Sequence, residues 1–289
     1  MLVEKITSRQ NPLVKRFRRL HTGADRHLVL IEGVRMVEEA LAAGAHFESI
    51  AFTSELDGTE RGMALQDRLQ RVPCRGAFLS KQVMEYISDT DTPQGVAAIV
   101  TRPNVDLEAI IHPRTQLIVI ADGIQDPGNL GAIVRSAEAS GATGMVVLPG
   151  TTNPFGTKSV RASMGSVLRF PVAAATSAKD VISMAEQMGI SLIAAVQEKS
   201  VDRGRVKSQP YTDVDYRSRI ALIVGNEGSG VSDELLSQAS ALVHIPMAPV
   251  VESLNVAAAA SIILYEAARQ RGFSFGKTRG KKRPPDARS

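Results

Sequence analysis

The chain has 289 residues, 44% hydrophobic and 22% charged, a composition typical of a soluble globular protein with room for two ordinary domains. Cys74 is the only cysteine, which excludes an intramolecular disulfide, and the five histidines form no zinc-binding motif, so we expect no metal. We find no secretory signal and no apolar run of about 18 residues that would cross a membrane. We therefore expect a cytoplasmic protein.

The net charge of +4 is unevenly distributed. Residues 1–27 hold seven basic and two acidic side chains, and residues 269–289 hold eight basic and one acidic, so the body between them is net negative. Two basic ends favour a polyanionic partner, because released counterions drive binding to phosphates. A tail that only improves solubility is the alternative interpretation.

Residues 1–103 alternate between strand and helix patterns. In chain order they predict a strand at 28–31, a helix at 33–43, a strand at 49–53, a helix at 62–69 and a strand at 94–100. This alternation indicates a small α/β sandwich domain. Residues 104–114 follow Pro103, contain Pro113 and have little apolar periodicity, so we place a linker there.

The second half, residues 115–271, repeats strand and helix patterns more regularly. Strands are predicted at 117–121, 145–148, 169–174, 192–196, 220–224 and 241–245, with helices between most of them and a last helix at 255–270. Residues 202–217 have no clear pattern and are predicted as a loop. Strand–helix–strand units require parallel pairing, so the fold class is α/β with a parallel sheet. Residues 272–289 form the basic tail.

Three polar segments follow predicted strands of this sheet. They are residues 126–135, residues 223–230, and residues 244–247 with 252–256. Ligands bind outside the carboxyl ends of strands in open α/β sheets, so the segments are expected to converge on one pocket. The loop that Gly225 opens exposes main-chain groups, but it lacks the lysine of a phosphate-binding loop. A simple strand-to-helix turn capped by Ser232 is the alternative.

The three segments together resemble the motifs of the SpoU/TrmH branch of the SPOUT RNA methyltransferases. The matching residues are Asn129, Arg135 and Glu138; Gly225-Asn226-Glu227-Gly228 with Gly230; and Ile245-Pro246-Met247 with Ser253-Leu254-Asn255. The order and spacing match as well. Residues 6–12 and 31–35 resemble, over shorter stretches, the N-terminal RNA substrate-binding domain of the same family, which is similar to small ribosomal RNA-binding proteins.

The resemblance implies a methyltransferase that moves a methyl group from S-adenosylmethionine to a ribose 2′-hydroxyl, and it also implies a trefoil knot and a homodimer. By family position the cofactor contacts are Gly225, Ile245 and Leu254, with Met247 shaping the same wall. Such a transfer needs donor and acceptor held in line and no metal.

The candidate catalytic residues are Arg135, Asn129, Glu227, Ser253 and Asn255. We interpret Arg135 as a group that clamps an RNA phosphate and stabilises the developing alkoxide, since a guanidinium is a poor base. The proton acceptor is left open. An exposed ion pair between Arg135 and Glu138 is the alternative. Asn129 and Asn255 either position the ribose or simply cap helices.

The favoured substrate is structured RNA, with 23S ribosomal RNA ahead of transfer RNA. The chain has no Trp and few other aromatic residues, so recognition should depend on phosphates, 2′-hydroxyls and shape rather than on base stacking. A non-catalytic RNA-binding factor for ribosome assembly with the same fold is the alternative from another class. A dinucleotide-dependent oxidoreductase is disfavoured because the glycine fingerprint is missing.

Overall fold

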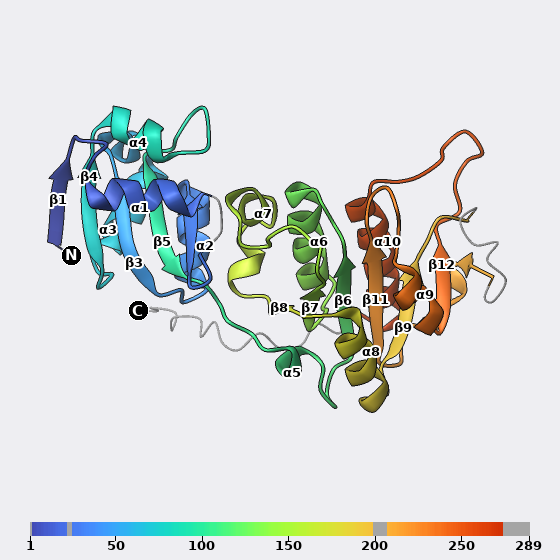
Figure 1. The fold of residues 1–289 in the computed structure, drawn as a ribbon. Helices are drawn as coiled ribbons and strands as arrows, with labels where there is room; N and C mark the ends of the chain where they lie inside the picture. The colour runs from blue at the N-terminus through green and yellow to red at the C-terminus, as the bar shows by residue number, and fades with distance from the viewer. Residues whose placement is uncertain (1, 22–24, 199–206, 274–289) are drawn as a thin grey trace, which may run out of the picture.

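The computed structural model describes residues 2–21, 25–198 and 207–273, and it contains two β-sheets that follow one another along the chain (Figure 1). The first sheet has the strand order β1-β4-β3-β5-β2 and the second has the order β10-β12-β9-β11-β6-β7-β8. Most of the predicted basic tail, from residue 274 onward, lies outside the described residues. No described helix is long and apolar enough to cross a membrane.

The first sheet carries helices on both faces. Its strands are β1 (Leu2–Ile6), β2 (Leu28–Glu32), β3 (Phe47–Phe52), β4 (Arg75–Leu79) and β5 (Val96–Thr101). The helices are α1 (Pro12–Leu20), α2 (Val34–Ala42), the 3-10 turn η1 (Ser54–Gly58), α3 (Glu60–Leu69) and α4 (Lys81–Ile87). Successive side chains of a strand point to opposite faces, so Leu30 packs with α1 and α4 while Val29 and Ile31 pack with α2 and α3. The predicted α/β sandwich is confirmed.

The sequence patterns did not predict β1, α1, β4 or α4. Helix α1 nevertheless has a clear start, because the Asn11 side chain accepts a hydrogen bond from the Leu13 backbone at 2.8 Å and Pro12 occupies the first turn. Its buried side chains are Leu13, Val14, Phe17 and Leu20. The remaining positions of the helix are largely basic, which leaves only a short apolar stripe as a signal.

The second sheet is parallel throughout, as predicted. Its strands are β6 (Leu117–Asp122), β7 (Gly144–Val147), β8 (Val172–Ala174), β9 (Ser191–Ala195), β10 (Gln209–Pro210), β11 (Ile220–Gly225) and β12 (Ala241–His244). The helical elements are α5 (Leu107–Ile110), α6 (Pro127–Ala139), α7 (Thr157–Ala162), η2 (Ser166–Leu168), α8 (Ala178–Gln187), η4 (Tyr211–Asp213), α9 (Asp233–Gln238) and α10 (Val256–Gln270). Apolar side chains of α6, α7 and α10 cover one face, and those of α5, α8 and α9 cover the other.

Three local expectations need correction. The strand predicted at 169–174 begins only at Val172, because η2 ends immediately before Arg169. The stretch predicted as a loop contains β10, which pairs with β12, and η4 in its described part. The linker contains the short helix α5, whose Ile110 is buried against the second sheet. In each case the segment has too few residues for a detectable period, so its structure depends on tertiary contacts.

The strand order places two distant segments side by side. Strand β11 lies between β9 and β6, and its register runs from Ile220 opposite Leu117 to Gly225 opposite Asp122. Both strands are parallel, so the loops that follow them leave the same edge of the sheet. The fold therefore brings the first two motif segments together.

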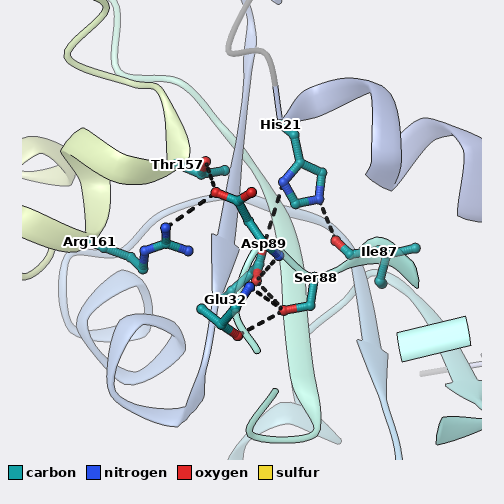
Figure 2. Close-up of polar contacts among 8 residues, drawn as sticks. His21, Glu32, Ile87, Ser88, Asp89, Thr157 and Arg161 are labelled. Atoms are coloured by element: carbon teal, nitrogen blue, oxygen red, sulfur yellow. Dashed lines mark hydrogen bonds and ion pairs between the residues drawn. The ribbon is translucent and has the colours of Figure 1, made fainter. Parts of the chain in front are cut away.

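The two halves of the chain meet at a polar junction between the end of α4 and helix α7 (Figure 2). Asp89 accepts hydrogen bonds from the Thr157 hydroxyl at 3.3 Å and from Arg161 Nη2 at 3.2 Å. Glu32 holds Asp89 in place by accepting from its backbone N–H at 3.2 Å and from the Ser88 hydroxyl at 2.7 Å. The Glu32 side chain is only 8% exposed, so these donors offset much of the cost of its burial.

A second junction uses one arginine as a bridge. Arg169 donates from Nη1 to Glu39 of α2 at 2.8 Å, and from Nε to Glu138 of α6 at 2.6 Å. A β-carbon on Gly165, just before η2, would lie 2.7 Å from the Glu39 Cβ, so glycine allows the close approach here. The N-terminal half is thus tied to α6 as well as to α7.

Candidate active site

The three polar segments converge at the carboxyl ends of the second sheet. The second and third segments border a cavity of about 620 Å³ between the loop after β11 and the segment joining β12 to α10, and hydrogen bonds tie the first segment to both of them. The predicted site residues that line it are Gly225, Glu227, Ile245, Met247, Ser253, Leu254 and Asn255. Asn129 and Arg135 are not among the lining residues, although Asn129 contacts two of them.

A chain of hydrogen bonds joins the three segments. The Asn255 side-chain amide donates to Asn129 Oδ1 at 2.8 Å, and the Asn129 amide donates to Glu227 Oε1 at 2.9 Å. The three residues come from the start of α10, the first turn of α6 and the loop after β11. This Asn255–Asn129–Glu227 chain is the contact that makes one site out of three motifs.

Glu227 also fixes the segment between β6 and α6. Its carboxylate accepts from the backbone N–H groups of Gln125 at 3.1 Å and of Asp126 at 3.2 Å. Partial burial raises the pKa of Glu227, but the hydrogen bonds from Asn129 and from backbone N–H groups outweigh it and leave the pKa below its usual value. Glu227 is therefore ionised at neutral pH and already accepts three hydrogen bonds.

The loop after β11 is folded tightly on itself. Asn226 and Gly230 exchange two backbone hydrogen bonds of 2.9 and 3.0 Å, and Asn226 Oδ1 accepts from the N–H groups of Gly228 and Ser229. Gly225 is buried directly below, where a β-carbon would lie 2.3 Å from Val231 N. Only glycine fits at this position, because the opposing atoms belong to the backbone.

Helix starts supply part of the site. Asn255 caps α10, with Oδ1 accepting from the N–H groups of Ala257 at 2.9 Å and Ala258 at 3.3 Å. Asn129 does not cap α6, contrary to the capping alternative, because Asp126 occupies that position and accepts from the Asn129 N–H at 2.7 Å. The Asn129 side chain is thereby left for Glu227 and Asn255.

Arg135 lies further along α6 on an exposed position beside the buried stripe. The alternative ion pair with Glu138 does not form, because both Glu138 oxygens accept from Arg169. None of the ion pairs among the described residues includes Arg135. The guanidinium is thus open to a ligand at the surface of the helix that begins in the site.

The third segment supplies the apolar part of the cavity. Ile245 and Met247 are partly buried, and the Leu254 side chain remains 39% exposed at the cavity mouth. Ser253 is also exposed, beside Leu254. Across residues 2–21, 25–198 and 207–273 there is no group of three His, Cys, Asp or Glu side chains that could hold a metal ion.

Three further residues organise the site, although their contacts were not expected from the sequence. Asn226 donates from its side-chain amide to the Gly123 carbonyl at 2.7 Å, which ties the loops after β6 and β11 together. The Asp122 carboxylate accepts from the Ser232 N–H at 2.7 Å, in place of a side-chain cap by Ser232. Gln125 donates to the carbonyls of Gly123 and Gly150. Asn226 belongs to the second motif, whereas Asp122 and Gln125 carry no signal beyond their place after a predicted strand and before a predicted helix.

Two protein-family models match this chain. A model described as the SpoU rRNA Methylase family matches residues 116–265, and the MRM3-like substrate binding domain matches residues 11–98. The chain belongs to the SpoU rRNA methylase family. The match includes all three motif segments, and the second match covers most of the first sheet. The family suggested by the motifs is therefore confirmed.

Relatives in this family match along most of their length. An uncharacterized tRNA/rRNA methyltransferase of Synechocystis is 35% identical, over 93% of this chain and 94% of that protein. The 23S rRNA (guanosine(2553)-2′-O)-methyltransferase of Bacillus subtilis is 31% identical, over 91% of this chain and 98% of that protein. The similarity thus includes both halves of the chain.

Solved structures of SpoU-type enzymes share the whole architecture. The AdoMet-bound rRNA methyltransferase of Sinorhizobium meliloti superposes with a TM-score of 0.78 at 33% identity, covering 92% of this chain and 98% of that one. The SpoU methyltransferase AviRb of Streptomyces viridochromogenes, in complex with AdoMet, also gives 0.78, at 27% identity over 91% and 98%. The fold is therefore that of the SPOUT methyltransferases.

Proposed function

We propose that this protein transfers a methyl group from S-adenosylmethionine to a ribose 2′-hydroxyl of ribosomal RNA. The Asn255–Asn129–Glu227 chain carries the proposal, because it assembles the three family motifs at the mouth of one cavity. Relatives named as 23S rRNA 2′-O-methyltransferases, similar over both halves, support the reaction and the RNA class. A transfer RNA substrate remains the alternative.

The cavity suits S-adenosylmethionine in its mixed lining. Gly225 and the loop behind it offer bare main-chain groups, while Ile245, Met247 and Leu254 offer an apolar wall for the adenine. The β-carbon position of Gly225 is filled by the backbone of Gly230 and Val231, so glycine is needed for the loop to fold this closely beside the cavity. The bound cofactor supplies an already activated methyl group on its sulfonium.

The remaining predicted residues serve the acceptor. Arg135 binds an RNA phosphate and stabilises negative charge as the 2′-oxygen attacks. Asn129 and Asn255 hold the ribose side of the pocket in register with the cofactor side, and Ser253 lies at the mouth to contact the ligand. Glu227 acts as a fixed organiser rather than a proton acceptor, because its oxygens already accept three hydrogen bonds from neighbouring segments.

We further infer that the chain forms the trefoil knot of its superfamily, acts in the cytoplasm and works as a homodimer. Exposed apolar side chains near the third segment and on α10 support the dimer: Val250, Val251, Leu254, Tyr265 and Phe273. Size-exclusion chromatography with light scattering tests this, and a monomeric mass at micromolar concentration contradicts it.

The function is tested by tritiated methyl transfer from S-adenosylmethionine to total RNA from a strain that lacks the protein, followed by mapping of 2′-O-methyl sites. We expect incorporation at a single ribose of 23S ribosomal RNA. Incorporation into transfer RNA instead would correct the substrate. No incorporation into mature RNA or ribosomal precursors, with the cofactor still bound, would favour a non-catalytic assembly factor.

A further inference from the structure

Two arginines from different parts of the first domain lie over one aromatic ring. The Arg9 guanidinium carbon is 5.0 Å from the centroid of the Tyr86 ring, and the Arg18 carbon is 5.5 Å from it. Arg9 precedes α1, Arg18 lies in its last turn, and Tyr86 belongs to α4, which packs beside α1. Cation–π contacts hold both guanidinium groups against the same ring.

Tyr86 is built into the fold, whereas its two partners are exposed. The ring is partly buried against the core formed by α1 and α4, and both arginines lie at the surface. A ring anchored in this way restricts the long arginine side chains before any ligand binds. Less side-chain entropy is then lost when a ligand is bound.

Arg9 and Arg18 differ from other arginines of this domain in their ion pairing. Arg61 pairs with Glu38, and Arg75 pairs with Glu4 at 2.7 Å. In the part of the chain that the structure describes, no ion pair includes Arg9 or Arg18. Two like charges share one ring without a neutralising carboxylate, so an anion bound between them would gain favourable electrostatic energy.

The outward face of α1 extends the positive charge. The exposed residues Lys15, Arg18 and Arg19 of this helix are all basic. Arginine stacked on a ring keeps its N–H edge available, and that edge matches the paired oxygens of a phosphate. A row of phosphates fits the extended basic face better than a single anion does.

We propose that Arg9, Arg18 and Tyr86 form a surface that contacts phosphates of the RNA substrate. Only the identification of the ligand as that RNA rests on the proposed function. Tyr86 lies three residues before Asp89, which bonds Thr157 and Arg161 of α7 (Figure 2). Helix α7 packs directly on α6, where a β-carbon on Gly131 would lie 2.4 Å from the Ser159 carbonyl. RNA held on this surface is thus held on a domain that these contacts connect, through α7, to the helix of Asn129.

The test compares two double variants with equal loss of charge. Arg9→Gln/Arg18→Gln removes the proposed contacts, and Arg61→Gln/Arg75→Gln removes two arginines that already have carboxylate partners. The probe is unmodified 23S ribosomal RNA made by transcription, bound in filter assays from 50 to 300 mM KCl. Because each lost phosphate contact lowers the salt slope by about 0.7–0.9, we expect the slope of the first variant to fall by about 1.5 and that of the control to change little.

A third variant separates the ring from the charges. Tyr86→Leu retains an apolar side chain against the core, so we expect an unchanged salt slope and an affinity weakened about threefold through loss of the cation–π contacts. Unchanged affinity in this variant would overturn the role of the ring.

Equal salt slopes in the wild type and Arg9→Gln/Arg18→Gln would refute the proposal that this surface contacts the RNA. The surface would then be expected to bind another polyanion, such as an acidic protein face. Methyl transfer by the wild type to the same transcript reports separately on the proposed function. Active wild type with equal slopes refutes the surface alone. A lower slope in a protein that transfers no methyl group supports the surface and refutes the function.

Discussion

Replacing Gly225 with alanine tests whether the cavity needs a bare main chain at the end of β11. The added β-carbon would lie 2.3 Å from the Gly230 carbonyl carbon and from Val231 N, and 2.4 Å from the Gly230 oxygen. All three are backbone atoms, so the loop itself must move. Overpacking of this kind costs about 1–3 kcal/mol. Relieving the crowding by opening the two Asn226–Gly230 hydrogen bonds instead would cost a similar amount, roughly 1 kcal/mol each.

We therefore expect Gly225→Ala to weaken S-adenosylmethionine binding about 10- to 100-fold, since about 1.4 kcal/mol corresponds to each factor of ten. Isothermal titration calorimetry measures the affinity, and circular dichroism confirms that the variant is folded at the temperature used. Gly228→Ala is the matched control. A β-carbon there would meet nothing closer than Asn226 Oδ1 at 3.5 Å, an ordinary contact. Its affinity should stay within about twofold of the wild type.

Wild-type affinity in a folded Gly225→Ala protein would refute the reasoning, because the loop would then tolerate the methyl group without moving. Equal losses in both variants would also contradict it, since they would point to loop flexibility rather than to crowding at one position.

Other substitutions test the acceptor side of the site, the α6–α7 contact, the Glu227 carboxylate and the junction at Asp89. Arg135→Ala should abolish methyl transfer and leave S-adenosylmethionine affinity within about twofold, because its role is at the acceptor; transfer assays and calorimetry measure the two effects. Gly131→Ala should lower the free energy of unfolding by about 1–3 kcal/mol in denaturant titrations, because its β-carbon would press on the backbone of α7. The pKa of Glu227 is lowered in the folded protein, so its ionised form stabilises the fold at pH values above the ordinary carboxyl pKa, and this contribution is lost as the pH falls through the pKa of the folded state. The wild type should therefore have a free energy of unfolding higher than that of Glu227→Gln by at most about 1 kcal/mol, because the group is exposed, and this difference should disappear in acid. Asp89→Ala and Arg161→Ala should each slow methyl transfer to RNA several-fold, and the double variant should be no slower than the worse single one, because the two side chains act through one contact.

Each of these predictions has an outcome that contradicts it. Loss of cofactor affinity in Arg135→Ala equal to the loss of activity would place the arginine on the cofactor side. An unchanged unfolding midpoint for Gly131→Ala would mean that α7 can shift freely. A stability gap for Glu227→Gln that widens in acid would reverse the sign of the linkage. Additive losses at Asp89 and Arg161 would show that the two residues act independently.

The sequence predicted the second sheet better than the first. Buried parallel strands are continuous apolar runs separated by helices, so their number and direction can be read from the pattern. Strand β1 is short, with Val3, Glu4 and Lys5 all exposed, and its position is set by pairing with β4. Helix α5 is one turn long and exists because Ile110 is buried. Neither the pairing of β1 with β4 nor the burial of Ile110 can be read from the local sequence.

Motif spacing selected candidate site residues, several of which line the cavity, but it did not reveal their contacts. The partner of each side chain depends on strand order, which periodicity does not show. The pairing of Glu138 with Arg169 rather than with Arg135 is an example, since Arg169 reaches α6 only after the chain has passed through α7 and η2. The same limit concealed the contact of Asn226 with Gly123, a residue 103 positions earlier that follows the neighbouring strand β6.

Capping a helix and building the site are not alternatives for Asn255. An asparagine side chain has a carbonyl oxygen and an amide nitrogen, and the two ends can serve different partners. Asn255 Oδ1 accepts from the first turn of α10, and the amide of the same side chain donates to Asn129. An aspartate could cap as well but could not donate, and an alanine could do neither. The cap orients the side chain that the site needs, so the stability of α10 and the alignment of the three motifs depend on the same group.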